Sequence, residues 1–294
     1  MSWLDKLTNY FGKRPNGKSI LYFRYAIYFI LIFRIFWLFP INSNLIIIHQ
    51  ITSGQSFELN NFLIQPIFYL LNNAITIQQF FMLSLLIIVL AIYKGHSILL
   101  AILLFIISLF LNELSKPIIN GGDRMHCLLL FVNIFFFTNN KFYTYDFRFR
   151  LHNFFLLGIK IHICIFYFIS GLDKLMDPKW LNGEALQTVS SLSEYAVNGF
   201  QNLNNLHLLT FLSWAAIVFE LSFGILIWFK LVRFWVLITG IIFHLFIAIF
   251  LSLPDFSLVM LSSYLLFYSI NPKQFKMDKT KKPALSSGLS VPNN

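Results

Sequence analysis

The chain has 294 residues, of which 57% are hydrophobic and only 12% are charged, and its formal net charge is +10. This balance excludes a soluble domain with an ordinary core and indicates a polytopic membrane protein. In such a protein the basic excess indicates cytoplasmic Lys and Arg near anionic lipid, and no nucleic-acid partner is expected.

The N-terminal segment, residues 1–18, combines basic residues with apolar residues at helical spacing. The apolar ones are Trp3, Leu4, Leu7, Tyr10 and Phe11. This pattern predicts a short amphipathic helix in the membrane interface. The apolar run from Ile20 is too long for a signal peptide and has no small-residue cleavage site, so we expect it to stay as a membrane helix.

Eight apolar segments approach or exceed the length that crosses a bilayer. They are residues 20–39, 75–93, 97–115, 124–138, 153–174, 207–229, 233–252 and 257–270. We therefore predict an all-α fold, a polytopic transmembrane helix bundle of about eight spans, with the membrane domain at residues 19–270. The connection 41–74 is expected on the outer side, and the Lys-rich tail 271–294 is expected to be disordered.

The distribution of Lys and Arg predicts the orientation. With the N-terminus in the cytoplasm, most basic residues fall in cytoplasmic pieces, whereas the connection 41–74 has none. This asymmetry predicts that both termini are cytoplasmic and that an even number of helices crosses the membrane. Lys174 then lies near the outer boundary. The segment 176–206 is expected to fold over it, with Leu186, Val189 and Leu192 on one face of a short helix.

Ionisable groups inside a bilayer are costly, so each is a candidate site residue. Arg34 lies deep in the first segment and is expected to have a buried partner. Asp123 closes the loop NGGD, where it could cap the next helix or take part in a site. Glu220 lies in the middle of its segment and is predicted not to face lipid, with Arg34, His244 or Tyr264 as its partner.

The fifth segment carries a stripe of residues on one helical face. These are Lys160, Cys164, Tyr167, Gly171 and Lys174, and His162 faces elsewhere. Gly171 leaves room for a flat ring to approach the helix. Lys174 ends the apolar run with Trp180 six residues further on, and partial desolvation favours the neutral amine that a general base needs. The structural alternative is a lysine that snorkels beside an interfacial tryptophan.

Three histidines lie in apolar segments, at His126, His162 and His244. Such residues could ligate a haem or a metal, but no HxxxH or other paired spacing supports this, and no metal is expected. A lone membrane histidine is more often a hydrogen-bonding group between helices.

Three stretches together resemble the HTTM (horizontally transferred transmembrane) domain, which is the membrane domain of vitamin K-dependent gamma-glutamyl carboxylase and its bacterial relatives. They are FYFISGLDKLMDPKWLNGEAL, NGGDRMHCLLLF at 120–131, and the segment 218–267 with its acidic residue and FH-containing helix. The resemblance covers most of residues 20–270.

The resemblance implies an integral membrane enzyme with carboxylase-like (lyase) chemistry. Lys174 in GLDKL matches the lysine held to deprotonate a reduced quinone, and His244 matches the FH position. The resemblance implies a site around a vitamin K hydroquinone-like cofactor, shaped by Tyr167, Gly171, Trp180, Glu220 and Asp123. A peptide or small-molecule substrate would reach it from the non-cytoplasmic side.

The carboxylase also has a large extramembrane C-terminal region, whereas this sequence ends soon after its last predicted span. A second hypothesis is therefore a non-enzymatic membrane protein that acts in maturation of, or immunity to, a secreted peptide, or as its partner. A transporter is a third hypothesis, although neither an inverted repeat nor a pair of broken helices is visible.

Overall fold

The computed structural model describes residues 17–39, 77–95, 97–115, 119–136, 145–192, 203 and 205–268. In these ranges all regular secondary structure is helical, which confirms the predicted all-α fold. The helices are α2 (Gly17–Leu38), α5 (Ile77–Lys94), α6 (Ile98–Leu114), α7 (Gly121–Asn133), α8 (Tyr145–Met176), α9 (Pro178–Leu181), α10 (Glu184–Ser191), α11 (Leu206–Leu226), α12 (Arg233–Phe250) and α13 (Pro254–Tyr268). The predicted interfacial helix within residues 1–18 and the predictions for 41–74 and 271–294 lie almost entirely outside the described residues.

Each of the eight predicted membrane segments coincides with one of these helices. Four helices in the described ranges are long and apolar enough to cross a membrane: Lys18–Leu38, Phe147–Met176, Leu206–Leu226 and Arg233–Phe250. Two further apolar helices, Gln78–Lys94 and Ile98–Leu114, are shorter. The structure thus supports a membrane protein with several spanning helices, and the number eight stays a prediction.

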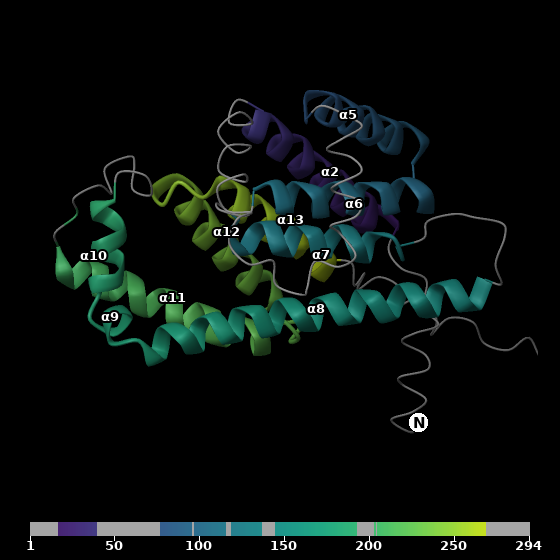
Figure 1. Cartoon of the computed structure of the whole chain (residues 1–294). Helices are drawn as coiled ribbons and strands as arrows, with labels where there is room; N and C mark the ends of the chain where they lie inside the picture. Colours follow the sequence, from purple (N-terminus) through teal and green to yellow (C-terminus); the bar gives the residue numbers. More distant parts are fainter. Residues whose placement is uncertain are drawn as a thin grey trace, which may run out of the picture.

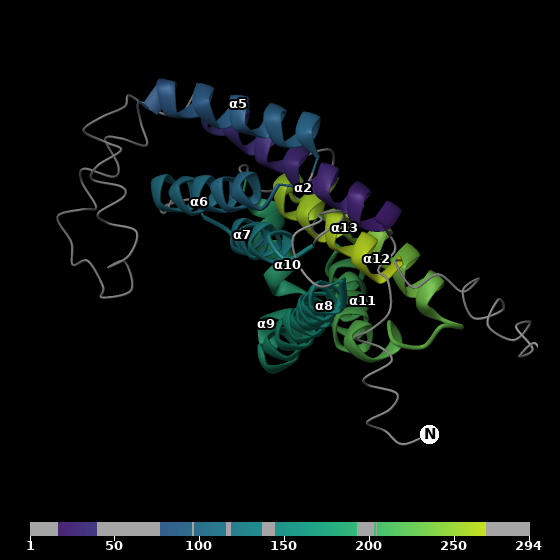
Figure 2. The ribbon, with the colours of Figure 1, turned by 90° about the vertical axis from the view of Figure 1, so that its right-hand side faces the viewer.

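The helices pack around α13. This helix contacts α2, α7, α8 and α12, whereas α5 lies at the edge of the bundle against α2 and α6. Helix α8 runs along one side of the molecule, and its C-terminal end carries α9 and α10, which return the chain to α11 (Figure 1). Seen from the right of Figure 1, α8 and α11 lie together at the side opposite to α2 and α5 (Figure 2).

Most of the apolar core is one continuous cluster that draws side chains from α2, α5, α6, α7, α8, α11, α12 and α13. A second, smaller cluster lies under α9 and α10, where Leu186 and Leu209 are buried together with part of Trp180. The expectation of an ordered segment after α8 is therefore confirmed up to Leu192. Of the predicted face of α10, Leu186 is buried but Leu192 is 45% exposed, because the helix ends at Ser191.

Helices α8 and α11 approach each other closely at two glycines. A Cβ added at Gly171 would lie 2.9 Å from Cγ of Leu221, and one added at Gly224 would lie 3.1 Å from the carbonyl oxygen of Cys164. Side chains larger than hydrogen would force the two helices apart. The space that Gly171 leaves is thus filled by Leu221, and this glycine permits close helix packing.

We expect Gly171→Ala to destabilise the protein by about 1–3 kcal/mol, because the added methyl group overpacks the contact with Leu221. Gly158→Ala on the same helix is the matched control, since a Cβ there would meet nothing within 4 Å. The control should leave stability unchanged or raise it by up to about 1 kcal/mol. Thermal unfolding of both variants in one detergent measures the difference. Equal melting temperatures would contradict the close contact.

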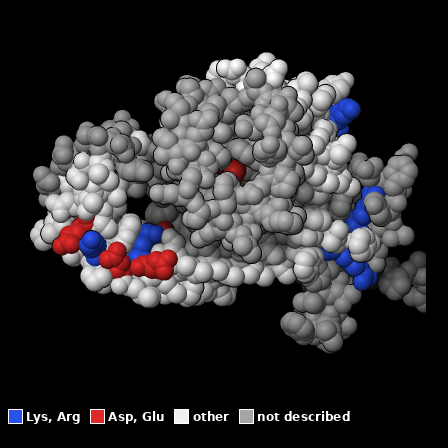
Figure 3. All heavy atoms as spheres, in the orientation of Figure 1, with Lys and Arg blue, Asp and Glu red and all other residues white. Residues whose placement is uncertain are grey.

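Charged side chains lie mainly at the two ends of the molecule in the view of Figure 3. The end that carries α9 and α10 shows both acidic and basic side chains, whereas the opposite end shows Lys and Arg (Figure 3). The acidic side chains at the first end include Asp173, Asp177 and Glu184, and the N-terminal end of α8 carries Arg148 and Arg150. The orientation in which the α9–α10 end faces away from the cytoplasm stays a prediction from the distribution of Lys and Arg in the sequence.

The predicted orientation can be tested with reporter fusions. A fusion after Leu192 is expected to report the non-cytoplasmic side, and a fusion after Asn294 is expected to report the cytoplasm, because the basic residues favour that arrangement. Paired alkaline phosphatase and fluorescent protein fusions at each position measure both sides. If both positions report the same side, the predicted topology is wrong.

Candidate functional site

The charged centre of the site is an ion pair between the C-terminal end of α8 and an interior position of α11. Nζ of Lys174, in the last turn of α8, lies 2.8 Å and 3.0 Å from the two carboxylate oxygens of Glu220 on α11. The side chain of Lys174 is 17% exposed and that of Glu220 is 7% exposed. Glu220 therefore does not face lipid, as predicted. Its partner is Lys174 and not Arg34, His244 or Tyr264, which had been expected.

Two neighbours complete the surroundings of the ammonium group. Nζ of Lys174 donates a hydrogen bond of 2.7 Å to Oγ of Ser170, which lies one turn earlier on the same helix. The ring of Trp180 lies 5.0 Å from Nζ, within the range of a cation–π contact. Trp180 is held by α9, whose first turn is capped by the side chain of Asp177. The short helices after α8 thus place an aromatic face over Lys174.

A second group of polar side chains lies deeper, on the same face of α8. The hydroxyl of Tyr167 lies 2.6 Å from Nε2 of His244 on α12 and 2.6 Å from the hydroxyl of Tyr264 on α13. His244 is fully buried, and its Nδ1 has no hydrogen-bond partner in the part of the chain that the structure describes. This group connects the three helices by hydrogen bonds inside the apolar core.

The position of Tyr264 depends on a glycine of α12. A Cβ added at Gly240 would clash with the hydroxyl of Tyr264, so this residue must be glycine for the tyrosine to reach Tyr167. The ring of Tyr264 also stacks on Phe223 at a centroid distance of 5.6 Å. The sequence places Gly240 one helical turn before His244, so the glycine and the histidine face the same side of α12.

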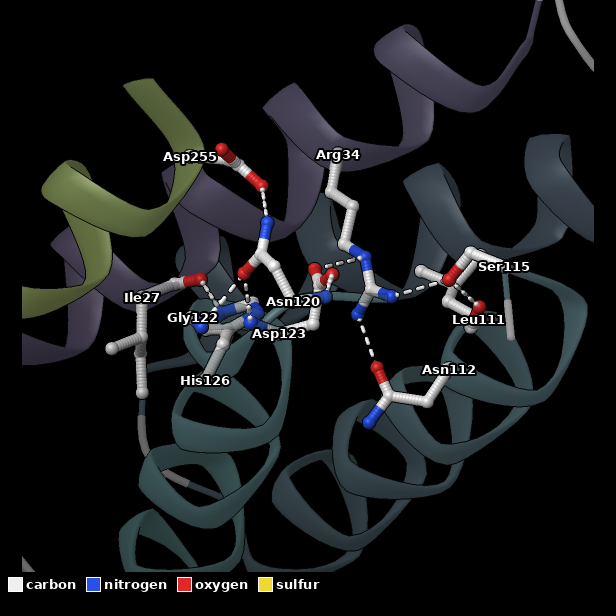
Figure 4. A network of polar contacts seen from close by, with 10 residues as sticks. All are labelled: Ile27, Arg34, Leu111, Asn112, Ser115, Asn120, Gly122, Asp123, His126 and Asp255. Atoms are coloured by element: carbon white, nitrogen blue, oxygen red, sulfur yellow. Dashed lines mark hydrogen bonds and ion pairs between the residues drawn. The ribbon is translucent and has the colours of Figure 1, made fainter. Parts of the chain in front are cut away.

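Asp123 belongs to a separate polar network at the start of α7 (Figure 4). Its carboxylate lies 3.0 Å from Nε of Arg34, whose other nitrogens donate to Asn112 (2.6 Å) and Ser115 (2.8 Å). Asp123 also accepts a hydrogen bond from the backbone of Asn120, which closes a capping box. The ion pair with Arg34 and the capping hydrogen bond thus account for both carboxylate oxygens of Asp123. The prediction that Arg34 has a buried partner is confirmed.

The first turn of α13 lies between the Arg34 network and the polar group around Tyr167. Asp255 accepts a hydrogen bond of 2.6 Å from the side-chain amide of Asn120 in the Arg34 network. The next residue, Phe256, lies 5.6 Å from the ring of His244 and packs against Gly122, where an added Cβ would come within 2.7 Å of its Cα. One turn of helix therefore contacts both the Arg34 network and the Tyr167 group.

Five of the seven residues predicted as site residues fall into two groups. Each group is built around one side chain of α8, Lys174 in the first and Tyr167 in the second. Lys174 contacts both Glu220 and Trp180, and Tyr167 contacts His244. Gly171 lies between these groups but faces Leu221, and Asp123 lies in the Arg34 network.

The three apolar-segment histidines have three different environments. His126 is buried, and its Nε2 lies 2.9 Å from the carbonyl oxygen of Ile27. His162 is exposed on the outer face of α8, as the helical spacing predicted, and His244 contacts Tyr167. Two of them therefore serve as hydrogen-bonding groups between helices, the more common role of a lone membrane histidine.

Two contributors to the site were missed. Ser170 lies four residues before Lys174, a spacing that places both on one helix face, so the sequence did carry a signal for it. Tyr264 was considered only as a partner of Glu220, and its contact with Tyr167 depends on the crossing of α8 and α13, which no local pattern encodes.

These features define a helical membrane protein with a lysine–carboxylate pair at one end of its longest described helix. A family model of the HTTM domain matches residues 56–271, which is more than half of the chain. The chain therefore belongs to the HTTM family, and its resemblance to the membrane domain of the carboxylase follows from this membership. No curated protein and no solved structure gives a significant match.

Proposed function

We propose that this HTTM protein is a membrane enzyme that binds a reduced quinone beside Lys174 and uses this lysine as a general base. The observation that supports the proposal is the partly exposed Lys174–Glu220 pair under the ring of Trp180. An ion pair that only held two helices together would not require the Lys174 side chain to be accessible to solvent or to a ligand. A reduced quinone would supply an acidic hydroxyl group and the electrons for reaction with oxygen.

The residues around Lys174 suit a flat, partly apolar ligand with a hydroxyl group. Trp180 offers an aromatic face, and Ser170 and Glu220 offer polar atoms on the side of the helices. Ligand sites of this kind are mostly apolar, with a few polar groups that fix orientation. Lys174, Ser170 and Trp180 would hold the ring, and Tyr167 with His244 would shape the deeper wall of the site.

A lysine that acts as a base must first give up its own proton. Glu220 accepts two hydrogen bonds from Nζ of Lys174, at 2.8 Å and 3.0 Å, so it can take that proton without any movement of the helices. Burial penalises the two charges of the pair, which brings the neutral amine and carboxylic acid closer in free energy to the ion pair. The free amine can then accept the proton of a bound hydroxyl group.

The site lies at the end of α8 that is predicted to face away from the cytoplasm, next to the ordered α9 and α10. A peptide or small-molecule substrate would reach it from that side. A carboxylase-like reaction would require such a substrate to present an acidic C–H bond close to the quinone. The short helices over Lys174 would restrict water there, which favours proton transfer between the bound groups.

The alternative function is that of a non-enzymatic partner, maturation or immunity protein. In that case the Lys174–Glu220 pair would hold α8 and α11 together, and its chemistry would be irrelevant. The two functions differ in one respect, because the enzyme needs a lysine that can lose a proton, whereas a tether needs only a positive charge.

The test is direct. Purified full-length protein in lipid nanodiscs is supplied with reduced vitamin K and oxygen, and quinone epoxide is measured by chromatography. We expect epoxide to form at a rate proportional to enzyme concentration and to stop after heat inactivation. A second measurement follows quinone binding by quenching of tryptophan fluorescence, with Trp180→Phe as the reporter control. Absence of both binding and epoxide formation would overturn the proposal.

A further inference from the structure

Lys160 is a buried lysine that has no acidic partner among the residues that the structure describes. It is 1% exposed, and its Nζ lies 5.7 Å from the ring centroid of Phe267. No described residue gives its ammonium group a hydrogen bond or an ion pair. Arg34 and Lys174 are each paired with a carboxylate, and Arg24, which is as deeply buried as Lys160, donates hydrogen bonds to Asn133 and to the carbonyl oxygen of Phe136. Lys160 therefore differs from these three residues, because no described side chain or carbonyl gives it the partner that burial of a charge requires.

A second cation lies nearby. Phe267, whose ring lies under Nζ of Lys160, also contacts Trp228 at a ring-centroid distance of 6.3 Å, and Trp228 is hydrogen-bonded to Arg233 at the start of α12. Nε of Arg233 donates to the carbonyl oxygen of Ile227 at 2.9 Å, and one Nη donates to that of Trp228 at 3.3 Å. These bonds fix the guanidinium beside the turn between α11 and α12. Two neighbouring positive charges repel each other, so a group that binds here is expected to be an anion.

The surroundings of the two cations indicate where the anion comes from. The turn between α11 and α12 and the first turn of α12 expose large apolar side chains. They are Phe229 (58%), Leu231 (93%), Phe234 (61%) and Trp235 (67%). Side chains of this kind at the end of a membrane helix lie in the lipid interface. The turn is also predicted to face the cytoplasm, where anionic lipids are abundant.

We propose that Lys160 and Arg233 form a binding site for the phosphate of an anionic phospholipid. The phosphate would lie between the ammonium group of Lys160 and the guanidinium of Arg233, and the acyl chains would cover the exposed apolar side chains of the turn. Arginine and lysine at the inner end of packed membrane helices are a recurrent way to bind such headgroups. This site does not depend on the proposed quinone chemistry, because Lys160 lies four helical turns from Lys174.

The experiment uses the full-length protein in a zwitterionic detergent. Thermal unfolding is followed while phosphatidylglycerol, phosphatidylcholine or inorganic phosphate is added. We expect phosphatidylglycerol to raise the melting temperature in a concentration-dependent way, because a ligand that binds only the folded state stabilises it. Lys160→Gln and Arg233→Gln should each weaken binding about fivefold or more. Lys94→Gln, at an exposed position at the end of α5, is the matched control and should bind as the wild type does.

Two further variants separate binding from folding. Lys160→Arg keeps the charge and should keep most of the response to phosphatidylglycerol. Lys160→Met should melt at a higher temperature than the wild type without lipid, because it removes a buried charge that no described residue pairs, and it should lose the response to lipid. Equal shifts with phosphatidylglycerol and phosphatidylcholine, or a full response of Lys160→Met, would overturn the site. Equal shifts with inorganic phosphate would overturn the assignment to a lipid.

Discussion

Lys174→Arg is expected to abolish quinol-linked activity while leaving expression, membrane insertion and folding intact. Arginine keeps the positive charge and can still pair with Glu220, but it cannot lose a proton in a protein. A general base contributes about 10²–10⁴-fold to a rate, so the loss should be of that order. Epoxide formation by the purified variant in nanodiscs measures it, and an added small amine should restore part of the rate.

Lys179→Arg is the matched control for this variant. Lys179 lies in α9 at an exposed position five residues from Lys174, so its substitution changes the same kind of side chain outside the pair. The control should retain full activity. Glu220→Gln should lower the rate, because an amide cannot accept the proton of the lysine. If Lys174→Arg were as active as the wild type, the lysine would not be the base, and the tethering function would be favoured.

Arg34→Ala is expected to destabilise the protein by about 3–5 kcal/mol, the usual cost of removing one partner from a buried ion pair. The substitution leaves the carboxylate of Asp123 buried without its partner, and it also removes the hydrogen bonds to Asn112 and Ser115. Unfolding in mixed micelles at increasing denaturant concentration measures the change, and a lower yield of folded protein from membranes should accompany it.

Arg124→Ala is the control for this prediction, because Arg124 is exposed on the same turn of α7 as Asp123. It should change stability by less than about 0.5 kcal/mol. The double variant Arg34→Met, Asp123→Leu should be more stable than Arg34→Ala, since it replaces both charges by apolar groups. A single variant Arg34→Ala as stable as Arg124→Ala would contradict the central place of the pair.

Helical periodicity predicted the interior side of α8, because a single helix fixes which residues share a face. Cys164, Tyr167 and Gly171 are buried, and His162 is exposed, as the spacing required. The partners across the bundle were not predictable in the same way. Lys174 and Glu220 are far apart in sequence and meet only because α8 and α11 pack closely at Gly171 and Gly224.

The presence of charged residues in apolar segments showed which residues need a buried partner, but it did not identify the partner. Arg34 and Glu220 were both expected to be paired, and pairing them with each other was one of the options. The structure divides them between two networks because Asp123 lies at the start of α7, beside α2, while Lys174 lies on α8. The capping signal of the NGGD loop was correct, and it located the carboxylate that Arg34 needed.

Helix α8 is longer than a lipid bilayer is thick. The apolar stretch Phe147–Met176 has 30 residues, which corresponds to about 45 Å, whereas the hydrocarbon core measures about 30 Å. If the turns around Arg148 and Arg150 lie among the headgroups, the stretch from Phe154 to Met176 fits with a tilt of about 30°, within the range of natural membrane helices. A helix of this length can match bilayers of different thickness by changing its tilt, and its packing against α11 limits how far that tilt can change.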